Sequence, residues 1–314
     1  MILSSFLLSL NSILTLLVMI AAGYAAKRVF HFQSSEVKRF NLLVFHVFLP
    51  LMLFGNLYQA DLRSSVNAPL ILYAIGAILV LTAVTWVVVV KLEPQNARRG
   101  VMIQACFRSN MLLLGVPLVQ QLVPDADSAE FSLVITITVM LFNVLAILIL
   151  AYFSGRSVSP GQLLWDILKN PLILASLLGV LASLCSLRLP QFLEHAVSQL
   201  GSAASPIALV LLGAQFEVGQ ISASRRDLIF ITCTRLLLYP AAALTVAAAL
   251  GFRGGEFAVL IPAFCSPTAI NSFNMACQMG GDPDLAAGAV TTTTLFSAFT
   301  MFFWIFLFKS LGLF

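Results

Sequence analysis

The sequence has few ionisable side chains for its length. Of 314 residues, 10% are charged, with 17 Lys or Arg and 13 Asp or Glu, whereas 60% are hydrophobic. Soluble domains average roughly 25% charged and roughly 45–50% apolar residues. So few charges cannot cover a soluble core of this size, and such an apolar chain would not stay disordered. We therefore predict an integral membrane protein with the lipid bilayer as its solvent.

Several other features are missing. The net charge of +4 comes without any run of five or six like charges, so no nucleic-acid partner is predicted. The five cysteines form neither a CxxC motif nor a cluster with histidine, which excludes a disulfide framework or zinc site, and no metal or cofactor is predicted. Without an HExxH helix, a P-loop or an Asp pair at membrane depth, we predict that the protein is not an enzyme.

What the sequence does contain is long apolar runs, and a run of about 20 residues is enough for a membrane-crossing helix. We predict an all-α fold with ten transmembrane helices joined by short connections. The predicted segments cover residues 4–26, 40–59, 68–90, 98–122, 130–153, 163–187, 192–216, 227–250, 256–280 and 285–308.

The basic residues are unequally divided between the two sets of loops. The loops after segments 1, 3, 5 and 7 carry Lys27, Arg28, Lys38, Arg39, Lys91, Arg98, Arg99, Arg156, Arg225 and Arg226. The other side carries Arg63, Arg188, Arg253 and Lys309. Because basic loops stay in the cytoplasm, we predict a multi-pass protein of the cytoplasmic (inner) membrane with both termini outside.

The two halves of the chain, 1–157 and 158–314, show the same order of features. Pro50 matches Pro206 at an offset of 156, and Gln120 matches Gln278 at an offset of 158. Each half holds five predicted spans, so the second half enters the membrane from the opposite side. We therefore predict two inverted five-helix repeats, a construction common among secondary transporters.

Segments 4 and 9 carry unusual polar residues and prolines at membrane depth. Segment 4 contains Arg108, Ser109 and Asn110, and segment 9 contains Pro267 and Thr268. We predict that both helices are interrupted, because broken backbone in a membrane must be buried in protein or line a wet cavity. At an offset of 158 Ser109 aligns with Pro267, so the interruptions should meet as crossed discontinuous helices. The alternative is two ordinary structural kinks.

These interruptions supply the candidate substrate-binding residues. Arg108 is costly in a membrane, so it either attracts an anion or belongs to a structural pair. Asn110 can donate hydrogen bonds to a carboxylate, and Asn143 either does the same or joins neighbouring helices. Thr268 and Asn271 would complete the site from the second half. The half-helix N-termini also suit a carboxylate.

Other polar residues at depth receive weaker assignments. Arg235 favours a structural role, and His46 is either a proton relay or a packing residue. The hydroxyls of the threonines at 291–294 can bond back to their own helix, and no chemistry is assigned to them. No buried acidic cluster is apparent, which argues against sodium and leaves a proton as the coupling ion to be tested.

Three motifs resemble the auxin efflux carrier family. They are RSNMLLLGVPL at 108–118, LKNPLILASLLGVLASL at 168–184 and CSPTAINSFNMACQMGGDPDLAAGAV at 265–290. The resemblance implies a scaffold of helices 1, 2, 6 and 7, and a transport domain of helices 3–5 and 8–10. It also implies that anions bind beside the crossing of helices 4 and 9.

On this resemblance, Asn110 corresponds to the carboxylate-binding Asn, Pro267 to the crossover proline of the second half, and Asn143 to a helix 5 position near the substrate. Ser109 stands where the plant members usually have the first crossover proline, and Arg108 adds a positive charge. The short connection between helices 5 and 6 is similar to the bacterial branch, whose members are often assigned to malate or malonate.

The expected function is therefore secondary transport of a small mono- or dicarboxylate by alternating access. A non-transporting membrane sensor or assembly protein with the same fold is the alternative. A homodimer is the oligomeric state to be tested.

Overall fold

The computed structural model describes the chain at residues 14, 18–19, 21–59, 67–111, 118–119, 122–123, 128–154, 161, 165, 169–214 and 225–314. This described part is helical, and its pairing of extended residues is a single isolated bridge between Ser109 and Thr268. The predicted all-α class is thus confirmed. Most of the first predicted segment lies outside the described residues, as do Gln120 and positions 112–117 of the first motif.

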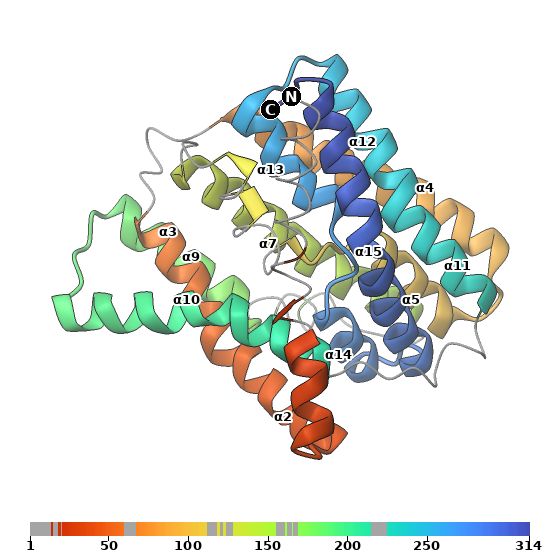
Figure 1. The fold of residues 1–314 in the computed structure, drawn as a ribbon, viewed down its shortest axis with the longest axis horizontal. Helices are drawn as coiled ribbons and strands as arrows, with labels where there is room; N and C mark the ends of the chain where they lie inside the picture. Colours follow the sequence, from red (N-terminus) through yellow and green to blue (C-terminus); the bar gives the residue numbers. More distant parts are fainter. Residues whose placement is uncertain are drawn as a thin grey trace.

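The helices follow the predicted segments in order (Figure 1). Their bounds are α2 (Ser34–Leu43), η1 (Val44–Phe48), α3 (Leu49–Gln59), α4 (Ala68–Leu92), α5 (Asn96–Phe107), α7 (Ser128–Phe153), α9 (Pro171–Leu184), α10 (Gln191–Ala214), α11 (Arg225–Cys233), η3 (Thr234–Leu238), α12 (Tyr239–Ala249), α13 (Gly254–Cys265), α14 (Asn271–Gln278) and α15 (Pro283–Ser310).

Five helical stretches in the described part are long and apolar enough to cross a membrane. They are Ser35–Gln59, Ala68–Leu92, Leu133–Phe153, Arg225–Ala249 and Pro283–Ser310, and α9 and α13 are shorter apolar helices. Several such helices in one chain make it a multi-pass membrane protein. The count of ten spans stays a prediction.

Two predicted helix starts differ from the structure. The helix of segment 2, predicted from residue 40, begins at Ser34. The segment predicted at 163–187 is interrupted before α9, which begins at Pro171. A proline disfavours helical backbone in the residue before it, and Asn170 is accordingly extended. The side chain of Asn170 caps α9 by accepting the N–H of Leu172 at 3.0 Å.

Two helices widen into a π-helical turn ahead of a proline. The turns η1 and η3 each end two residues before Pro50 and Pro240, respectively. Proline has no N–H and clashes with the carbonyl four residues earlier, so the wider turn relieves the clash. Pro240 leaves the Leu236 carbonyl without its helical donor, and the indole N–H of Trp304 donates to it at 2.9 Å.

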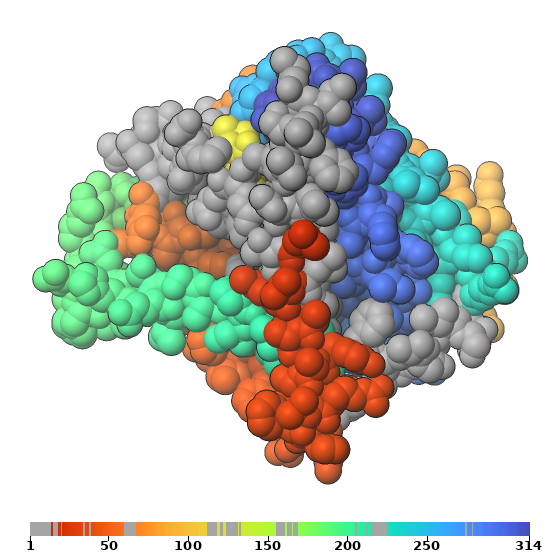
Figure 2. Space-filling view, in the orientation of Figure 1, coloured from red at the N-terminus to blue at the C-terminus, as the bar shows by residue number. Residues whose placement is uncertain are grey.

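The helices pack in two groups, which lie on opposite sides of Figures 1 and 2. In one group, α9 and α10 pack against α3, and glycines allow close contact. A Cβ at Gly179 would lie 2.9 Å from the Phe54 carbonyl oxygen, and one at Gly201 would lie 3.0 Å from Met52 Cα. The other group contains α4, α5 and α11 to α15, and α7 contacts both.

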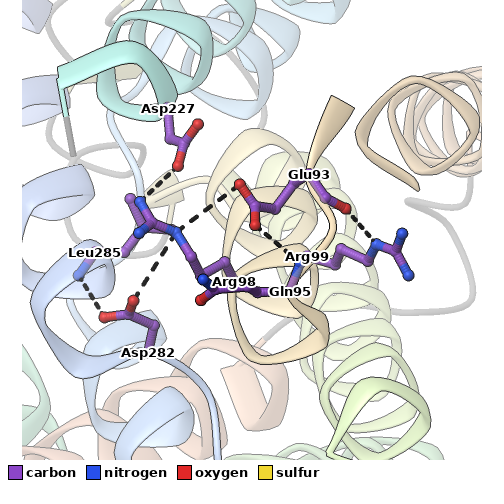
Figure 3. Close-up of polar contacts among 7 residues, drawn as sticks. All are labelled: Glu93, Gln95, Arg98, Arg99, Asp227, Asp282 and Leu285. Atoms are coloured by element: carbon purple, nitrogen blue, oxygen red, sulfur yellow. Dashed lines mark hydrogen bonds and ion pairs between the residues drawn. The ribbon is translucent and has the colours of Figure 1, made fainter. Parts of the chain in front are cut away.

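The connections gather on two faces. On one face, Arg98 pairs with Asp227 at 2.6 Å and lies 3.9 Å from Glu93 and 4.0 Å from Asp282 (Figure 3). These residues come from the predicted loops 3–4, 7–8 and 9–10. If each predicted segment crosses the membrane once, these loops lie on the same side of it.

Residues beside two other connections, 2–3 and 8–9, and the end of α15 are joined in the same way. The side chain of Asn67, before α4, donates to Glu256 in the first turn of α13 at 2.6 Å. The N–H of Gly254 donates to the carbonyl of Leu313, beyond the end of α15, at 2.7 Å. The odd-numbered connections described above thus contact one another, and so do the even-numbered ones.

Candidate functional site

The interruptions of segments 4 and 9 lie side by side. After α5 the chain is extended at Arg108, and after α13 it is extended at Ser266. The N–H of Asn110 donates to the Pro267 carbonyl at 2.9 Å, and the N–H of Ala269 donates to the Arg108 carbonyl at 3.0 Å. These two bonds hold the antiparallel bridge, so each broken helix satisfies part of the other's free backbone.

The bridge pairs Ser109 with Thr268, one residue beyond the aligned Pro267. Both side chains bond to the opposite half. The hydroxyl of Ser109 donates to the Pro262 carbonyl at 2.8 Å, and that of Thr268 donates to the Ala105 carbonyl at 2.7 Å. Pro267 and Thr268, both predicted as substrate-binding, therefore serve the backbone of the crossing. They are absent from the cavity lining described below.

Thr293 contributes to the crossing in a way that the sequence did not reveal. Its hydroxyl donates to the Ala289 carbonyl at 2.7 Å, which is the predicted bond to its own helix. The same hydroxyl accepts the N–H of Thr268 at 3.1 Å. This second contact was not predicted, because it depends on an N–H that the break in segment 9 leaves within reach of Thr293.

Arg235 lies behind the crossing and bonds to the ends of both half-helices. Its guanidinium donates to the carbonyl of Ser266 at 2.8 Å and to that of Ala263 at 2.9 Å. It also contacts the carbonyls of Cys106 and Phe107, each at 3.3 Å. The side chain is fully buried, at 0% exposed.

The chemistry of these acceptors explains the position of Arg235. The carbonyl of Ala263 would take its helical bond from Pro267, which has no N–H. The C-terminal ends of α5 and α13 carry partial negative charge, which a buried cation neutralises. The structural role favoured for Arg235 from the sequence is the one that these contacts describe.

Arg108 is also buried, at 3% exposed, but its partners are different. One Nη donates to Asn143 Oδ1 at 2.5 Å and the other contacts Met275 Sδ at 2.5 Å. Within the described part of the chain, no carboxylate forms an ion pair with Arg108. The partners of its guanidinium among the described residues are therefore a neutral amide and a thioether.

A small cavity of about 30 Å³ adjoins Arg108. Five of the predicted substrate-binding residues line it: Arg108, Ser109, Asn110, Asn143 and Asn271. The amide nitrogens of Asn110 and Asn143 are buried and donate to no acceptor among the described residues. Among the described residues, no Asp or Glu lines the cavity. The result is a cluster of hydrogen-bond donors around one cation, which suits an anion.

The cavity also has walls that the sequence analysis missed. Asn41 and Phe45, both from the helix of segment 2, lie opposite the crossing. Asn41 is 6% exposed, and a lone Asn beside an apolar run was a usable signal for it. Phe45 gave no signal, because aromatic residues in membrane helices are common.

A larger cavity of about 370 Å³ lies beside the first and shares Phe45 and Asn271 with it. Its lining adds His46 and Lys169, and also Met275, the residue that contacts Arg108. The Nδ1 atom of His46 lies 2.8 Å from the Leu42 carbonyl. The proton-relay role of His46 stays a prediction.

The N-terminus of α14 was expected to offer backbone donors to a carboxylate. The N–H groups of Ser272 and Phe273 instead donate to the carbonyls of Ala269 and Ile270, at 2.9 and 3.1 Å. Among the described side chains that line the cavity, the amide nitrogens of Asn110 and Asn143 are donors without an acceptor. The half-helix that follows Asn110 lies largely outside the described residues.

Comparison with known proteins identifies the family of the chain. A family model described as "Membrane transport protein" matches residues 8–305. An "Uncharacterized transporter" of Methanothermobacter thermautotrophicus is 25% identical over 310 residues, covering 95% of this chain and 98% of that protein. A "Putative malonate transporter" of Rhizobium meliloti is 22% identical over 291 residues, covering 90% of each. The chain therefore belongs to this membrane transport family, the auxin efflux carriers that its motifs resembled.

Proposed function

We propose that the protein is a secondary transporter of small organic anions, mono- or dicarboxylates such as malonate or malate, across the cytoplasmic membrane. The observation that carries the proposal is the donor cluster at the crossing. Arg108 and the unpartnered amide nitrogens of Asn110 and Asn143 converge on one cavity, and no acidic residue is among the described residues that line it. The similarity to a protein named as a malonate transporter agrees with this substrate class.

The hydrogen-bonding capacity of the site matches a carboxylate. An ionised carboxylate accepts up to about four hydrogen bonds, and each Asn amide nitrogen supplies two N–H donors. Arg108 adds a charged fork that pairs with a carboxylate bidentately. A dicarboxylate would place one group on Arg108 and the other on Asn110 and Asn143, so every polar atom of the ligand would find a donor.

The sizes of the two cavities support alternating access. The cavity at the crossing, about 30 Å³, holds a water molecule or two and is too small for malonate. The adjoining cavity of about 370 Å³ is large enough, and Phe45 and Asn271 line both. Substrate would enter through the larger cavity and reach the crossing when these shared walls move apart.

The contacts at the crossing also support the inverted repeat of residues 1–157 and 158–314. Each half supplies one helix that stops at the crossing and one extended stretch of the bridge. The connections separate onto two faces, as they would in two five-span repeats of opposite sense. The group of α4, α5 and α11 to α15 would then move the site against α3, α9 and α10.

Uptake of labelled malonate into liposomes that contain the purified protein tests the proposal. We expect Asn110→Ala to reduce uptake roughly 10- to 100-fold, since hydrogen bonds to charged groups contribute about 1.5–3 kcal/mol. Asn96→Ala, an exposed position on α5, is the matched control and should leave uptake unchanged. Equal uptake in the two variants would contradict the site assignment.

The same preparation distinguishes transport from sensing. A sensor would bind malonate, raising the melting temperature of the protein in detergent, yet would show no flux into vesicles. Binding without flux would therefore replace the proposed transporter with the sensor.

A further inference from the structure

The charge of Arg108 has a consequence for the empty carrier. Arginine stays protonated in proteins, so the cavity without substrate holds a full positive charge. In the described part of the chain, Arg108 and Arg235 are the cations that are almost fully buried. Arg235 donates to four backbone carbonyls, whereas the partners of Arg108 are a neutral amide oxygen and a sulfur atom.

We propose that the uncompensated charge of Arg108 makes the protein an anion exchanger, which changes sides readily only when an anion occupies the crossing. The inference rests on the proposed function. It concerns the return of the empty carrier, which the proposed function leaves open.

The loaded site and the empty site differ in how the charge of Arg108 is compensated. When a carboxylate lies on Arg108, the cation has a counter-ion and the amide nitrogens of Asn110 and Asn143 have acceptors. When the site is empty and closed to water, Arg108 has no counter-ion and the two amide nitrogens have no acceptor, in a medium of low dielectric constant. The loaded carrier therefore crosses its occluded state far more easily than the empty carrier.

The described linings of the two cavities supply no negative charge that would lower the cost of closing the empty site. Within the described residues, the linings of both cavities contain no Asp or Glu, and the larger cavity adds the cation Lys169. A carrier that exchanges one anion for another never has to pass through the unpaired state. Net transport requires that passage once in every cycle.

The test compares two modes of malonate uptake into liposomes containing the full-length protein. In the exchange mode the vesicles are loaded with unlabelled malonate, and in the net mode with a potassium HEPES buffer that contains no carboxylate. Valinomycin and equal potassium on both sides remove any membrane potential that net anion movement would create. We expect exchange to be faster than net uptake by roughly 100-fold, since insertion scales assign a charge at mid-membrane a penalty of that order.

Two variants of Arg108 distinguish the effect of its charge from the effect of its size and hydrogen bonding. Arg108→Lys keeps the charge and should keep a large ratio of exchange to net uptake. Arg108→Gln removes the charge and should bring the ratio to within a few-fold of one, whatever its effect on malonate affinity. The wild-type ratio stands as a test even if the Gln variant does not fold.

The outcomes distinguish the two proposals. Equal exchange and net uptake in the wild-type protein would overturn the exchanger while leaving the transporter intact. A large ratio that persists in Arg108→Gln would overturn the role of the charge. Absence of malonate flux in both modes would contradict the proposed function itself, and the inference with it.

Discussion

Arg108 and Arg235 lie on two sides of the same helix crossing, and both are buried at membrane depth. Around Arg235, the backbone carbonyls at the ends of α5 and α13 accept the available guanidinium N–H groups. Around Arg108, two side chains accept hydrogen bonds without supplying negative charge, and a cavity with free amide donors adjoins it.

Burial alone therefore does not assign a role to an intramembrane arginine. Backbone carbonyls at helix ends are fixed in place, and their dipoles compensate the cation permanently. Side-chain acceptors can turn away and give their place to a ligand. The type of acceptor, and whether it compensates charge, separates the structural arginine from the one in the candidate site.

Replacing Arg235 should have the largest effect on the fold. Arg235→Met leaves four buried carbonyls without this donor, at about 1–3 kcal/mol for each group that stays unsatisfied. We expect a loss of stability on the order of 4 kcal/mol or more, seen as a large fall in melting temperature in detergent. Arg99→Met is the matched control, because Arg99 donates to the carbonyls of Glu93 and Val90 on the half-exposed end of α4. Similar losses of stability in both variants would contradict the structural role assigned to Arg235.

Replacing Arg108 should have the opposite pattern. Arg108→Met removes a desolvated charge that has no counter-ion, so the melting temperature should stay constant or rise. Malonate exchange should fall by more than about 30-fold, because the charged partner of the carboxylate is gone. A fall in melting temperature as large as that of Arg235→Met would show that Arg108, too, is structural.

A permanent counter-ion for Arg108 should weaken malonate binding and reduce the preference for exchange over net uptake. Asn143→Asp places a carboxylate where the amide oxygen now lies 2.5 Å from the Arg108 guanidinium. The new ion pair would compete with substrate, raising the malonate concentration for half-maximal exchange about 10-fold, and would bring net uptake closer to exchange. Asn143→Ala removes the acceptor without adding charge and should leave the exchange preference in place. Tighter malonate binding in the Asp variant would contradict the assigned role of Arg108.

The smallest effect is expected at Ser109, whose side chain contributes one hydrogen bond to the crossing. Ser109→Ala should lower stability by about 1 kcal/mol through loss of the bond to the Pro262 carbonyl. Ser109→Pro should also fold, because the two bonds of the bridge use the N–H groups of Asn110 and Ala269 and leave that of Ser109 out. Unfolding of the proline variant, judged by size-exclusion chromatography, would show that this reading of the bridge is wrong.

The sequence predicted the features that depend on local patterns. Apolar runs revealed the membrane helices, and polar residues inside those runs revealed Arg108, Asn110 and Asn143, which meet in one cavity. Each signal was visible because a polar side chain is expensive in lipid and therefore rare there.

The partners of the broken backbone were beyond sequence reasoning. Every residue has a carbonyl, so no pattern marks those of Cys106 or Ala263 as the acceptors of Arg235. The same holds for Thr293, whose use as an acceptor depends on a break in another helix. The helix start was predicted at residue 163, whereas α9 begins at Pro171. The apolar run extends past the cap at Asn170, so hydropathy alone did not mark the boundary.

The bridge at the crossing also constrains how the protein matures. Its two extended stretches are about 160 residues apart in the chain, which at roughly 5–20 residues per second separates their synthesis by roughly 8–30 s. During that interval the end of α5 has neither the bridge nor Arg235, so its free backbone groups need water or another protein in the insertion machinery. The amino-terminal half therefore cannot finish folding alone, and the last helices to emerge from the ribosome complete a structure begun by the first.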